Sequence, residues 1–329
     1  MRALLGSIGA ALALLLVCCV VAVLVGTQPV SVLKALADPA SMDRLILVGV
    51  RLPRVALAAL AGGGLAAVGV AFQAVLRNPL AEPYVLGVSG GAALGATLAL
   101  VLAAGVIGAW AGMVVPIAAL AGGLAATALV YWIARAGGEV SGASILLAGV
   151  IVNAIAGALI TFIKTLVSAS KAQELLFWLM GFIDVPSGVT LVSLSVYVLL
   201  GSAVLIADSG RMNLLSLGDE QAQHLGVNTR AMERRIYIAC SLIVGAIVSV
   251  TGLIGFVGLV VPHALRRLLG PDHRVLVPTS LLAGGAMLVL CDLVARFSFQ
   301  WLGTEPPVGA VTALVGGPLF LVLLRRKAA

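Results

Sequence analysis

The sequence predicts an all-α integral membrane protein, and its composition is the first reason. Of the 329 residues, 61% are hydrophobic and only 10% are charged, and the mean hydropathy is +1.18. Soluble domains contain about 25% charged residues, and a water-soluble chain of this size could not cover so much apolar surface with polar groups. The composition therefore excludes a soluble enzyme, a disordered chain and a secreted disulfide scaffold.

The second reason is the number of apolar stretches that can span a bilayer, for which a helix needs about 20 residues. Ten stretches are candidates: 4–26, 52–75, 84–107, 111–134, 142–165, 190–208, 234–253, 254–267, 276–297 and 307–324. The first is too long for a signal peptide and is interpreted as a retained helix. The eighth is short, and Gly252 just before it and Gly255, Gly258 and Pro262 within it break it up. Such an interruption is tolerated only where protein or a cavity covers the freed backbone groups.

The ten spans divide into a first helix, a sixth helix and two sets of four. Spans 2–5 and 7–10 start on opposite sides of the membrane, as in inverted-repeat transporters. The sequence therefore predicts one polytopic domain, residues 1–329, with ten transmembrane helices.

Basic residues are distributed unevenly between the two sides of the predicted membrane. With ten spans both termini lie on one side, and 13 of the 20 Lys and Arg residues fall on that side. The positive-inside rule therefore places both termini in the cytoplasm. The formal net charge of +7 reflects this topology and does not indicate a nucleic acid partner.

Three arginines depart from this distribution, because Arg51, Arg54 and Arg296 lie at the outer ends of the second and ninth spans. One interpretation is anchoring at lipid headgroups, where long basic side chains extend toward water. The other is docking of an acidic protein from outside, since guanidinium groups bind carboxylates strongly. Asp292 lies four residues before Arg296 on the same helical face and is a candidate partner for it.

Two loops are longer than the others. On the outside, 166–188 combines Leu175, Leu176 and Trp178 with polar residues in a pattern that predicts a short amphipathic helix at the membrane interface. On the inside, 209–235 is the longest polar stretch of the chain.

The sequence contains no metalloenzyme or CxxC redox motif. His224, His263 and His273 are far apart, and no HExxH or CxxC motif occurs. We expect no metal site and no cofactor bound to this chain, and we expect the four cysteines to be buried core residues.

Twelve of the 13 acidic residues lie in loops or at span ends, which disfavours ion-coupled transport. None of the four lysines follows a glycine, so there is no P-loop. If ATP drives this protein, ATP and Mg²⁺ bind to another chain.

Four motifs follow one another along the chain. They are RLPR at 51–54, NPLAEP at 78–83 followed by LGVSGGA at 86–92, LGDEQAQHLGV at 217–227, and GFVGLVVPH at 255–263 followed by GPDHR at 270–274. In the third motif, Glu220–Leu225 is expected to form a short helix that Gly226 terminates, because glycine accepts the left-handed cap geometry. Taken alone, this motif is also compatible with an ordinary solvated loop helix.

In this order the motifs closely resemble those of the FecCD-type permeases, which belong to ABC importers for iron siderophores, haem and cobalamin. The resemblance extends from the second span to Arg326, and Glu220, Ala222 and Gly226 match the E-x-A-x-x-x-G pattern of the coupling loop. It implies an inverted-repeat type II importer permease of the bacterial inner membrane. Its expected partners are a second permease subunit (in a homodimer or a heterodimer), two cytoplasmic ATPase subunits and a soluble substrate-binding protein outside. The chain itself is then a transport subunit and not an enzyme.

The resemblance also implies roles for particular residues. It places ATPase coupling at Gly218, Asp219, Glu220, Gln221, Ala222, Leu225 and Gly226, binding-protein docking at Arg51, Arg54 and Arg296, and a cytoplasmic gate at Asn78, Leu80, Ser141 and Ser144. The expected function is import of an iron chelate, in the first place a ferric siderophore, by alternating access. A haem or cobalamin importer is the alternative within the family, and a secondary transporter is the remote alternative.

Overall fold

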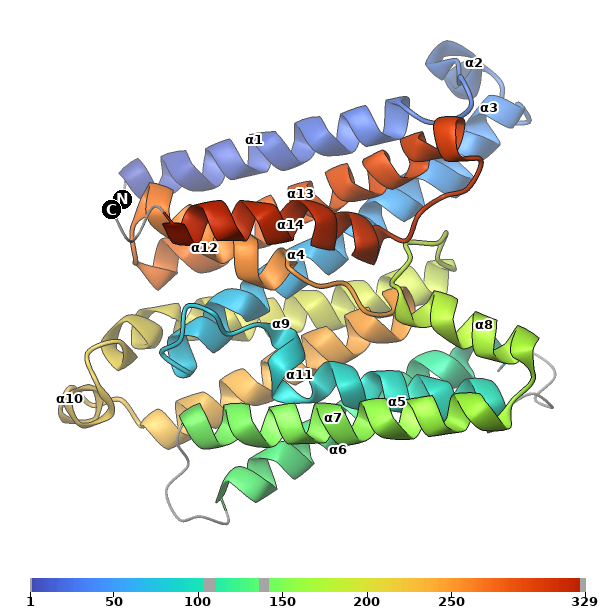
Figure 1. The fold of residues 1–329 in the computed structure, drawn as a ribbon. Helices are drawn as coiled ribbons and strands as arrows, with labels where there is room; N and C mark the ends of the chain where they lie inside the picture. Colours follow the sequence, from blue (N-terminus) through green and yellow to red (C-terminus); the bar gives the residue numbers. More distant parts are fainter. Residues whose placement is uncertain (1, 103–110, 136–141, 326–329) are drawn as a thin grey trace.

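The computed structural model describes residues 2–102, 111–135 and 142–325, and these residues form helices and no strands. Figure 1 shows the long helices side by side, with α10 at one end of the molecule and α2 at the other. The elements are α1 (Arg2–Leu24), α2 (Val32–Ala37), α3 (Met42–Arg44), the π-helix η1 (Leu45–Arg51), α4 (Leu52–Val75), the 3₁₀-helix η2 (Pro83–Leu86), α5 (Val88–Leu102), α6 (Ala111–Arg135), α7 (Gly142–Leu166), α8 (Ala169–Leu179), α9 (Gly188–Leu215), α10 (Asp219–His224), α11 (Thr229–Thr251), α12 (Val257–Leu269), α13 (His273–Leu302) and α14 (Val308–Arg325).

The ten predicted spans correspond to α1, α4, α5, α6, α7, α9, α11, α12, α13 and α14. Among the described residues, seven helices are long and apolar enough to cross a membrane, and Val88–Leu102 and Val308–Val322 are shorter apolar helices. The predicted amphipathic helix in 166–188 is present as α8. The all-helical membrane fold predicted from composition is therefore confirmed.

The helices extend further than their apolar stretches. The second span continues outward as one helical stretch, Met42–Val75, and the 209–235 loop is reduced to 216–228 because α9 and α11 continue into it. Hydropathy marks only the part of a helix that lies in lipid, whereas a helix satisfies its own backbone groups on either side of that boundary.

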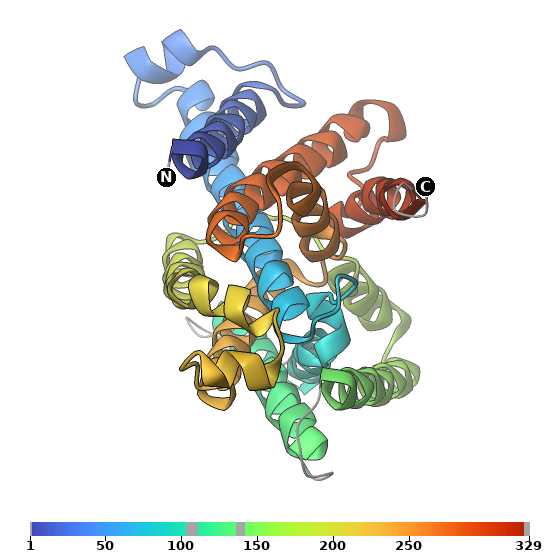
Figure 2. The ribbon, with the colours of Figure 1, turned by 90° about the vertical axis from the view of Figure 1, so that its left-hand side faces the viewer.

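Helix α4 lies at the centre of the molecule, and Figure 2 shows it between the other helices. It contacts α9, α11, α12 and α13, and its residues from Ala61 to Val75 are buried. Four of these are glycines. A Cβ atom on Gly62 would overlap with the backbone of Gly284 in α13, and one on Gly69 would overlap with the carbonyl of Gly258 in α12. Small residues thus let the backbones of α12 and α13 approach α4, as is usual between membrane helices.

The close approach at Gly69 predicts an unusual response to alanine. In a free helix Gly→Ala would stabilise by about 1 kcal/mol, but here the added methyl group collides with backbone that cannot rotate away. We expect Gly69→Ala to destabilise the protein by about 1–3 kcal/mol, measured as a lower midpoint of thermal unfolding in detergent. Gly9→Ala in α1, where a Cβ would meet no atom within 4 Å, is the matched control. Equal midpoints for the two variants would contradict the contact.

Two chain breaks meet inside the molecule. Helix α4 is followed by residues 76–87 and then α5, and α11 is followed by residues 252–256 and then α12. The backbone N–H of Phe256 donates to Oε1 of Glu82 at 2.6 Å. Gln73 Nε2 lies 3.4 Å from the carbonyl oxygen of Gly258. Glu82 thereby satisfies a free N–H group at the start of α12, and protein covers the interruption that the glycines of the eighth span predicted.

The two breaks also show the internal repeat. In α4–α7 and in α11–α14 alike, a long helix is followed by a break and then by the next helix. Discontinuous helices at corresponding positions are typical of inverted-repeat transporters. The repeat expected from the order of the spans is thus visible in the positions of the two breaks.

Candidate functional site

The segment 213–227 forms a compact projection at one end of the molecule. It contains the predicted short helix, which the structure places at Asp219–His224 as α10. Gly226 has φ +84°, its N–H donates to the carbonyl of Gln223 at 2.9 Å, and the N–H of Val227 donates to the carbonyl of Ala222 at 3.0 Å. These two bonds form a Schellman cap, for which glycine is the favoured residue.

Helix α10 is buried on one side and free on the other. Ala222 is fully buried and Val227 nearly so, against the core formed with α9 and α11. Glu220 and Gln221 are exposed, and Leu217 and Leu225, on either side of the helix, are each 58% exposed. Exposed leucines beside a helix that is itself packed against the core are suited to contact with another protein.

Ion pairs and hydrogen bonds fix the helices that carry this projection. Asp208 in α9 accepts two bonds from Arg235 in α11, at 3.1 and 2.9 Å. Asn213 near the end of α9 donates to Asp272 at 2.6 Å and accepts from the N–H of His273 at 2.8 Å. The bond from Asn213 holds the pKa of the Asp272 carboxyl below its usual range. Helices α9, α11 and α13 therefore present α10 on a rigid frame.

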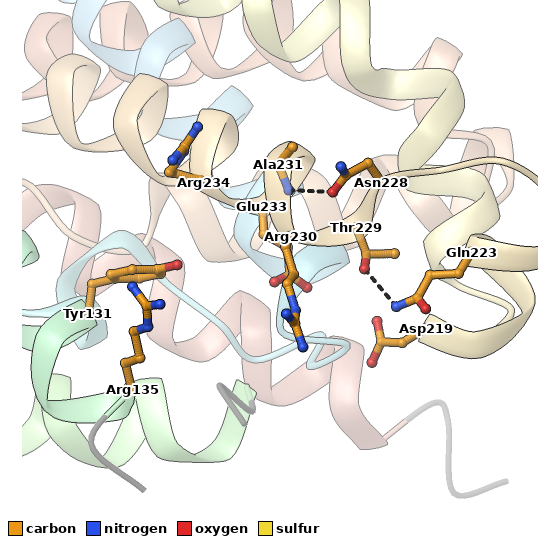
Figure 3. A pocket seen from close by; sticks show the side chains of 10 residues that line it. All are labelled: Tyr131, Arg135, Asp219, Gln223, Asn228, Thr229, Arg230, Ala231, Glu233 and Arg234. Carbon is orange, nitrogen blue, oxygen red and sulfur yellow. Dashed lines mark hydrogen bonds between the residues drawn. The ribbon is translucent and has the colours of Figure 1, made fainter. Parts of the chain in front are cut away.

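A polar cavity of about 550 Å³ lies beside α10, between the end of α6 and the start of α11. Figure 3 shows the side chains that line it: Tyr131, Arg135, Asp219, Gln223, Asn228, Thr229, Arg230, Ala231, Glu233 and Arg234. Gln223 donates to Thr229 at 3.2 Å and the N–H of Ala231 donates to Asn228 at 3.0 Å, so α10 and the start of α11 are joined along one wall. Among the residues that the structure describes, no group of three His, Cys, Asp or Glu side chains can hold a metal ion.

The predicted gate residues lie close to the same end. Asn78 Oδ1 accepts the N–H of Leu80 at 2.9 Å and so closes the NPL turn, while the side chain of Leu80 is exposed. A Cβ at Gly142, the first residue of α7, would lie 3.3 Å from Leu76. The structure thus brings the first turn of α7, which contains Ser144, next to the start of the turn; Ser141 lies outside the described residues.

An ion pair connects the NPL turn to α10. Arg77, the residue before Asn78, bonds to Asp219 in the first turn of α10, and its backbone has φ +47°. Sequence reasoning missed this contact because the two residues are 142 positions apart.

The three predicted docking arginines lie at the opposite end, near α2. Arg51 is only 5% exposed. Its guanidinium donates to the carbonyls of Val23 and Leu24 at 3.0 and 2.9 Å, and also to that of Gln28. Arg296 is 7% exposed and donates to the carbonyl of Ala22 at 3.1 Å. Both arginines therefore satisfy carbonyl groups at the end of α1 that have no partner within the helix.

Arg54 and Arg296 share one buried carboxylate. Arg54 donates to Asp292 Oδ1 at 3.0 and 2.9 Å, and Arg296 forms an ion pair with Oδ2 at 2.9 Å, as the spacing of four residues predicted. Glu305, in the segment between α13 and α14, pairs with Arg54 at 3.0 Å. The Asp292 side chain is fully buried and that of Arg54 is 13% exposed. We refer to Arg54, Asp292, Arg296 and Glu305 as the outer charge cluster.

The fold and this arrangement of two opposite polar ends are those of a multi-pass membrane protein. Sequence and structure comparisons agree with that class. The chain belongs to the FecCD transport family, whose profile matches residues 12–326. The cobalamin import system permease protein BtuC of Halobacterium salinarum is 44% identical over 283 residues, which cover 86% of this chain and 74% of that protein. The hemin transport system permease protein HmuU of Yersinia pestis is 37% identical over 282 residues, or 86% of this chain and 84% of that protein.

A solved structure gives the same result for the fold. A metal-chelate type ABC transporter in an inward-facing conformation superposes with a TM-score of 0.85 at 31% identity, over 98% of this chain and 99% of that chain. The type II importer fold expected from the motifs is thereby confirmed, and the chain is a permease of an ABC importer.

Proposed function

We propose that this permease carries a metal chelate, in the first place a ferric siderophore, from outside the cell into the cytoplasm. Two permease subunits would form the membrane part, two ATPase subunits would bind at the α10 end, and a soluble binding protein would deliver the cargo at the α2 end. The observation that carries the proposal is the exposed helix α10 on its rigid frame, which has the E-x-A-x-x-x-G pattern of a coupling helix.

The proposed orientation places the α10 end in the cytoplasm and the protein in the inner membrane. Basic residues predominate on the side of the predicted termini. In Figure 1 the start of α1 and the end of α14 both lie at the end that carries α10. Sequence and fold thus support the same orientation.

Helix α10 is positioned to pass a movement of the ATPase on to the proposed gate. Its buried face contacts α9 and α11, and the pair of Arg77 with Asp219 connects it to the turn with Asn78 and Leu80. Because these two side chains are 40% and 54% exposed, their attraction contributes no more than about 1 kcal/mol. The ion pair is therefore too weak to hold the turn in one position. The buried face of α10, packed against α9 and α11, is the contact that transmits the movement.

Docking of the binding protein is proposed at the outer charge cluster. The guanidinium groups of Arg51 and Arg296 already bind carbonyl groups at the end of α1. We therefore propose that these two arginines fix the shape of the docking surface and do not bind the partner directly. Arg54 lies beside the partly exposed Glu305. It is the guanidinium of the three that an acidic side chain of the partner reaches first, by displacing Glu305.

Reversal of charge at Arg54 tests this assignment. Arg54→Glu is expected to weaken association with the binding protein about tenfold or more at low salt, and less at high salt because exposed charges are screened. Glu305→Gln, which removes the competing carboxylate, is expected to strengthen association. The measurement is titration of the binding protein onto the permease–ATPase complex in nanodiscs. Lys34→Glu, an exposed lysine on α2 at the same end, is the control, and unchanged low-salt affinity in both cluster variants would rule out the role.

A second candidate cargo is cobalamin or haem, because the relatives above are named for import of cobalamin and of hemin. The complete transporter in proteoliposomes distinguishes the cargos: a ferric siderophore, hemin and cobalamin are supplied in turn, and ATP-dependent uptake is measured. Uptake of the siderophore alone supports the first candidate. ATP hydrolysis by the purified chain without partners would contradict the division of labour on which both candidates rest.

A further inference from the structure

A second cavity, of about 450 Å³, lies among α5, α7 and α8 and the break between α11 and α12. It extends from Tyr84 in η2 and Ser89 at the start of α5 to Lys164 near the end of α7 and Leu179 at the end of α8. The end of α7 is the one that the predicted topology places outside. The cavity thus reaches from that side of the membrane to the chain break in the interior.

Two residues that line the inner end of this cavity carry hydroxyl groups without a hydrogen-bond partner among the residues that the structure describes. These groups are the hydroxyls of Tyr84 and Ser89, both shielded from solvent, and Ser89 as a whole is 1% exposed. Leaving a buried hydroxyl without a partner is unfavourable, so polar atoms of a bound molecule would satisfy them. Asn153 is already used, because it donates to the carbonyl of Tyr84 at 2.5 Å and accepts from the N–H of Gly90 at 3.2 Å; it holds the start of α5 in place.

The charges that line the cavity favour an anion. The first turn of α5 forms its inner wall, and the N-terminal end of a helix carries a partial positive charge. Lys164 lines the outer part, and no carboxylate of the described residues forms an ion pair with it. None of the described lining residues is an aspartate or glutamate. The carboxylate of Glu82 lies near Tyr84, but it does not line the cavity and its Oε1 accepts the N–H of Phe256. A lysine near a helix C-terminus can serve the helix alone, but the two unpartnered hydroxyls at the other end of the same cavity indicate a ligand.

We propose that this cavity binds the negatively charged, oxygen-rich part of the cargo on its way through the permease. The class of cargo is a metal chelate with free carboxylate groups, with Lys164 as the contact for its charge and the Tyr84 and Ser89 hydroxyls as partners for its oxygens. The inference rests on the proposed import of metal chelates and narrows it to anionic ones.

Cysteine modification at Thr161 tests the electrostatic part of the proposal directly. Thr161 is exposed, lines the cavity and lies one helical turn before Lys164. In full-length permease with its native cysteines replaced by alanine, Thr161→Cys is treated with an anionic and a cationic methanethiosulfonate reagent. We expect the ratio of the anionic to the cationic rate to fall about five- to tenfold with Lys164→Gln, since one charge at this separation acts oppositely on the two reagents. Lys164→Arg should retain the ratio. Leu33→Cys on α2, exposed and outside the cavity, is the control position whose ratio should not depend on residue 164.

Protection of Thr161→Cys from modification tests the ligand class. In phosphatidylcholine nanodiscs, ferric citrate should protect the cysteine from modification when residue 164 is lysine, and should not protect it in the Lys164→Gln variant. Cobalamin, which has no free carboxylate, should not protect the cysteine in either protein. The proposal would be overturned if the rate ratio were the same with lysine and with glutamine at position 164. It would also be overturned if ferric citrate and cobalamin protected the cysteine equally, or if neither protected it. Slow modification found only in phosphatidylglycerol nanodiscs would identify a lipid headgroup as the occupant and overturn it as well. These measurements need no transport, so uptake by the complete transporter remains an independent test of the proposed function.

Discussion

Leu225→Asp is expected to disconnect the permease from its ATPase while leaving the permease folded. Leu225 is 58% exposed, directly after α10, and a central apolar anchor of an interface contributes about 2 kcal/mol or more. A carboxylate at this position would be buried without a partner in the complex. Association with the ATPase should therefore weaken at least about thirtyfold, as measured by co-purification and by titration in nanodiscs.

The control for this variant is the same change at the opposite end. Leu36 in α2 is also an exposed leucine, and Leu36→Asp should leave association with the ATPase unchanged. Both variants should have the thermal unfolding midpoint of the parent protein, because neither leucine is in the core. Full association and full uptake in Leu225→Asp would contradict the coupling role of α10.

Asp292→Ala is expected to be the most destabilising single change at the α2 end. It removes the carboxylate shared by Arg54 and Arg296 and leaves Arg296 buried without its counter-charge. Removing one partner of a buried ion pair costs about 3–5 kcal/mol. The unfolding midpoint in detergent should fall accordingly, and the yield of folded protein with it.

Two variants separate charge from simple loss of packing at Asp292. Asp292→Asn keeps the volume and one acceptor oxygen but no charge, so it should still destabilise. Glu305→Ala removes a carboxylate whose side chain is 35% exposed and should cost about 1 kcal/mol or less. If Asp292→Ala were no less stable than Glu305→Ala, the cluster would not be a stabilising element.

Local sequence signals predicted several features correctly. The apolar stretches coincide with the long helices, because in lipid the backbone has to satisfy its own hydrogen bonds within each segment. The end of α10 was predicted from Gly226, because the left-handed cap conformation is a property of a single residue. The pair of Asp292 with Arg296 was predicted from a spacing of four residues on one helix.

Contacts between distant parts of the chain were not predictable in this way. Arg51 was assigned by resemblance to a docking surface, but no sequence pattern indicates that its guanidinium holds carbonyl groups at the end of α1. Backbone carbonyls are present at every residue, so only their position in space makes them partners. The bonds from Arg54 to Asp292 join residues 238 positions apart. Helices α2 and α3, short and without a long apolar stretch, were also missed.

The sequence alone determined that this protein lies in a membrane as a bundle of apolar helices, that a short capped helix projects from a polar loop, and that the eighth span is interrupted. These features depend on hydropathy and backbone sterics within a few turns of chain. The tertiary structure decided that Glu82 caps α12 at Phe256 and that the glycines of α4 admit the backbones of α12 and α13. It also decided that two residues with unpartnered hydroxyls line the same cavity as Lys164. The physical reason is that such contacts depend on how all helices pack together, and no short window of sequence contains that information.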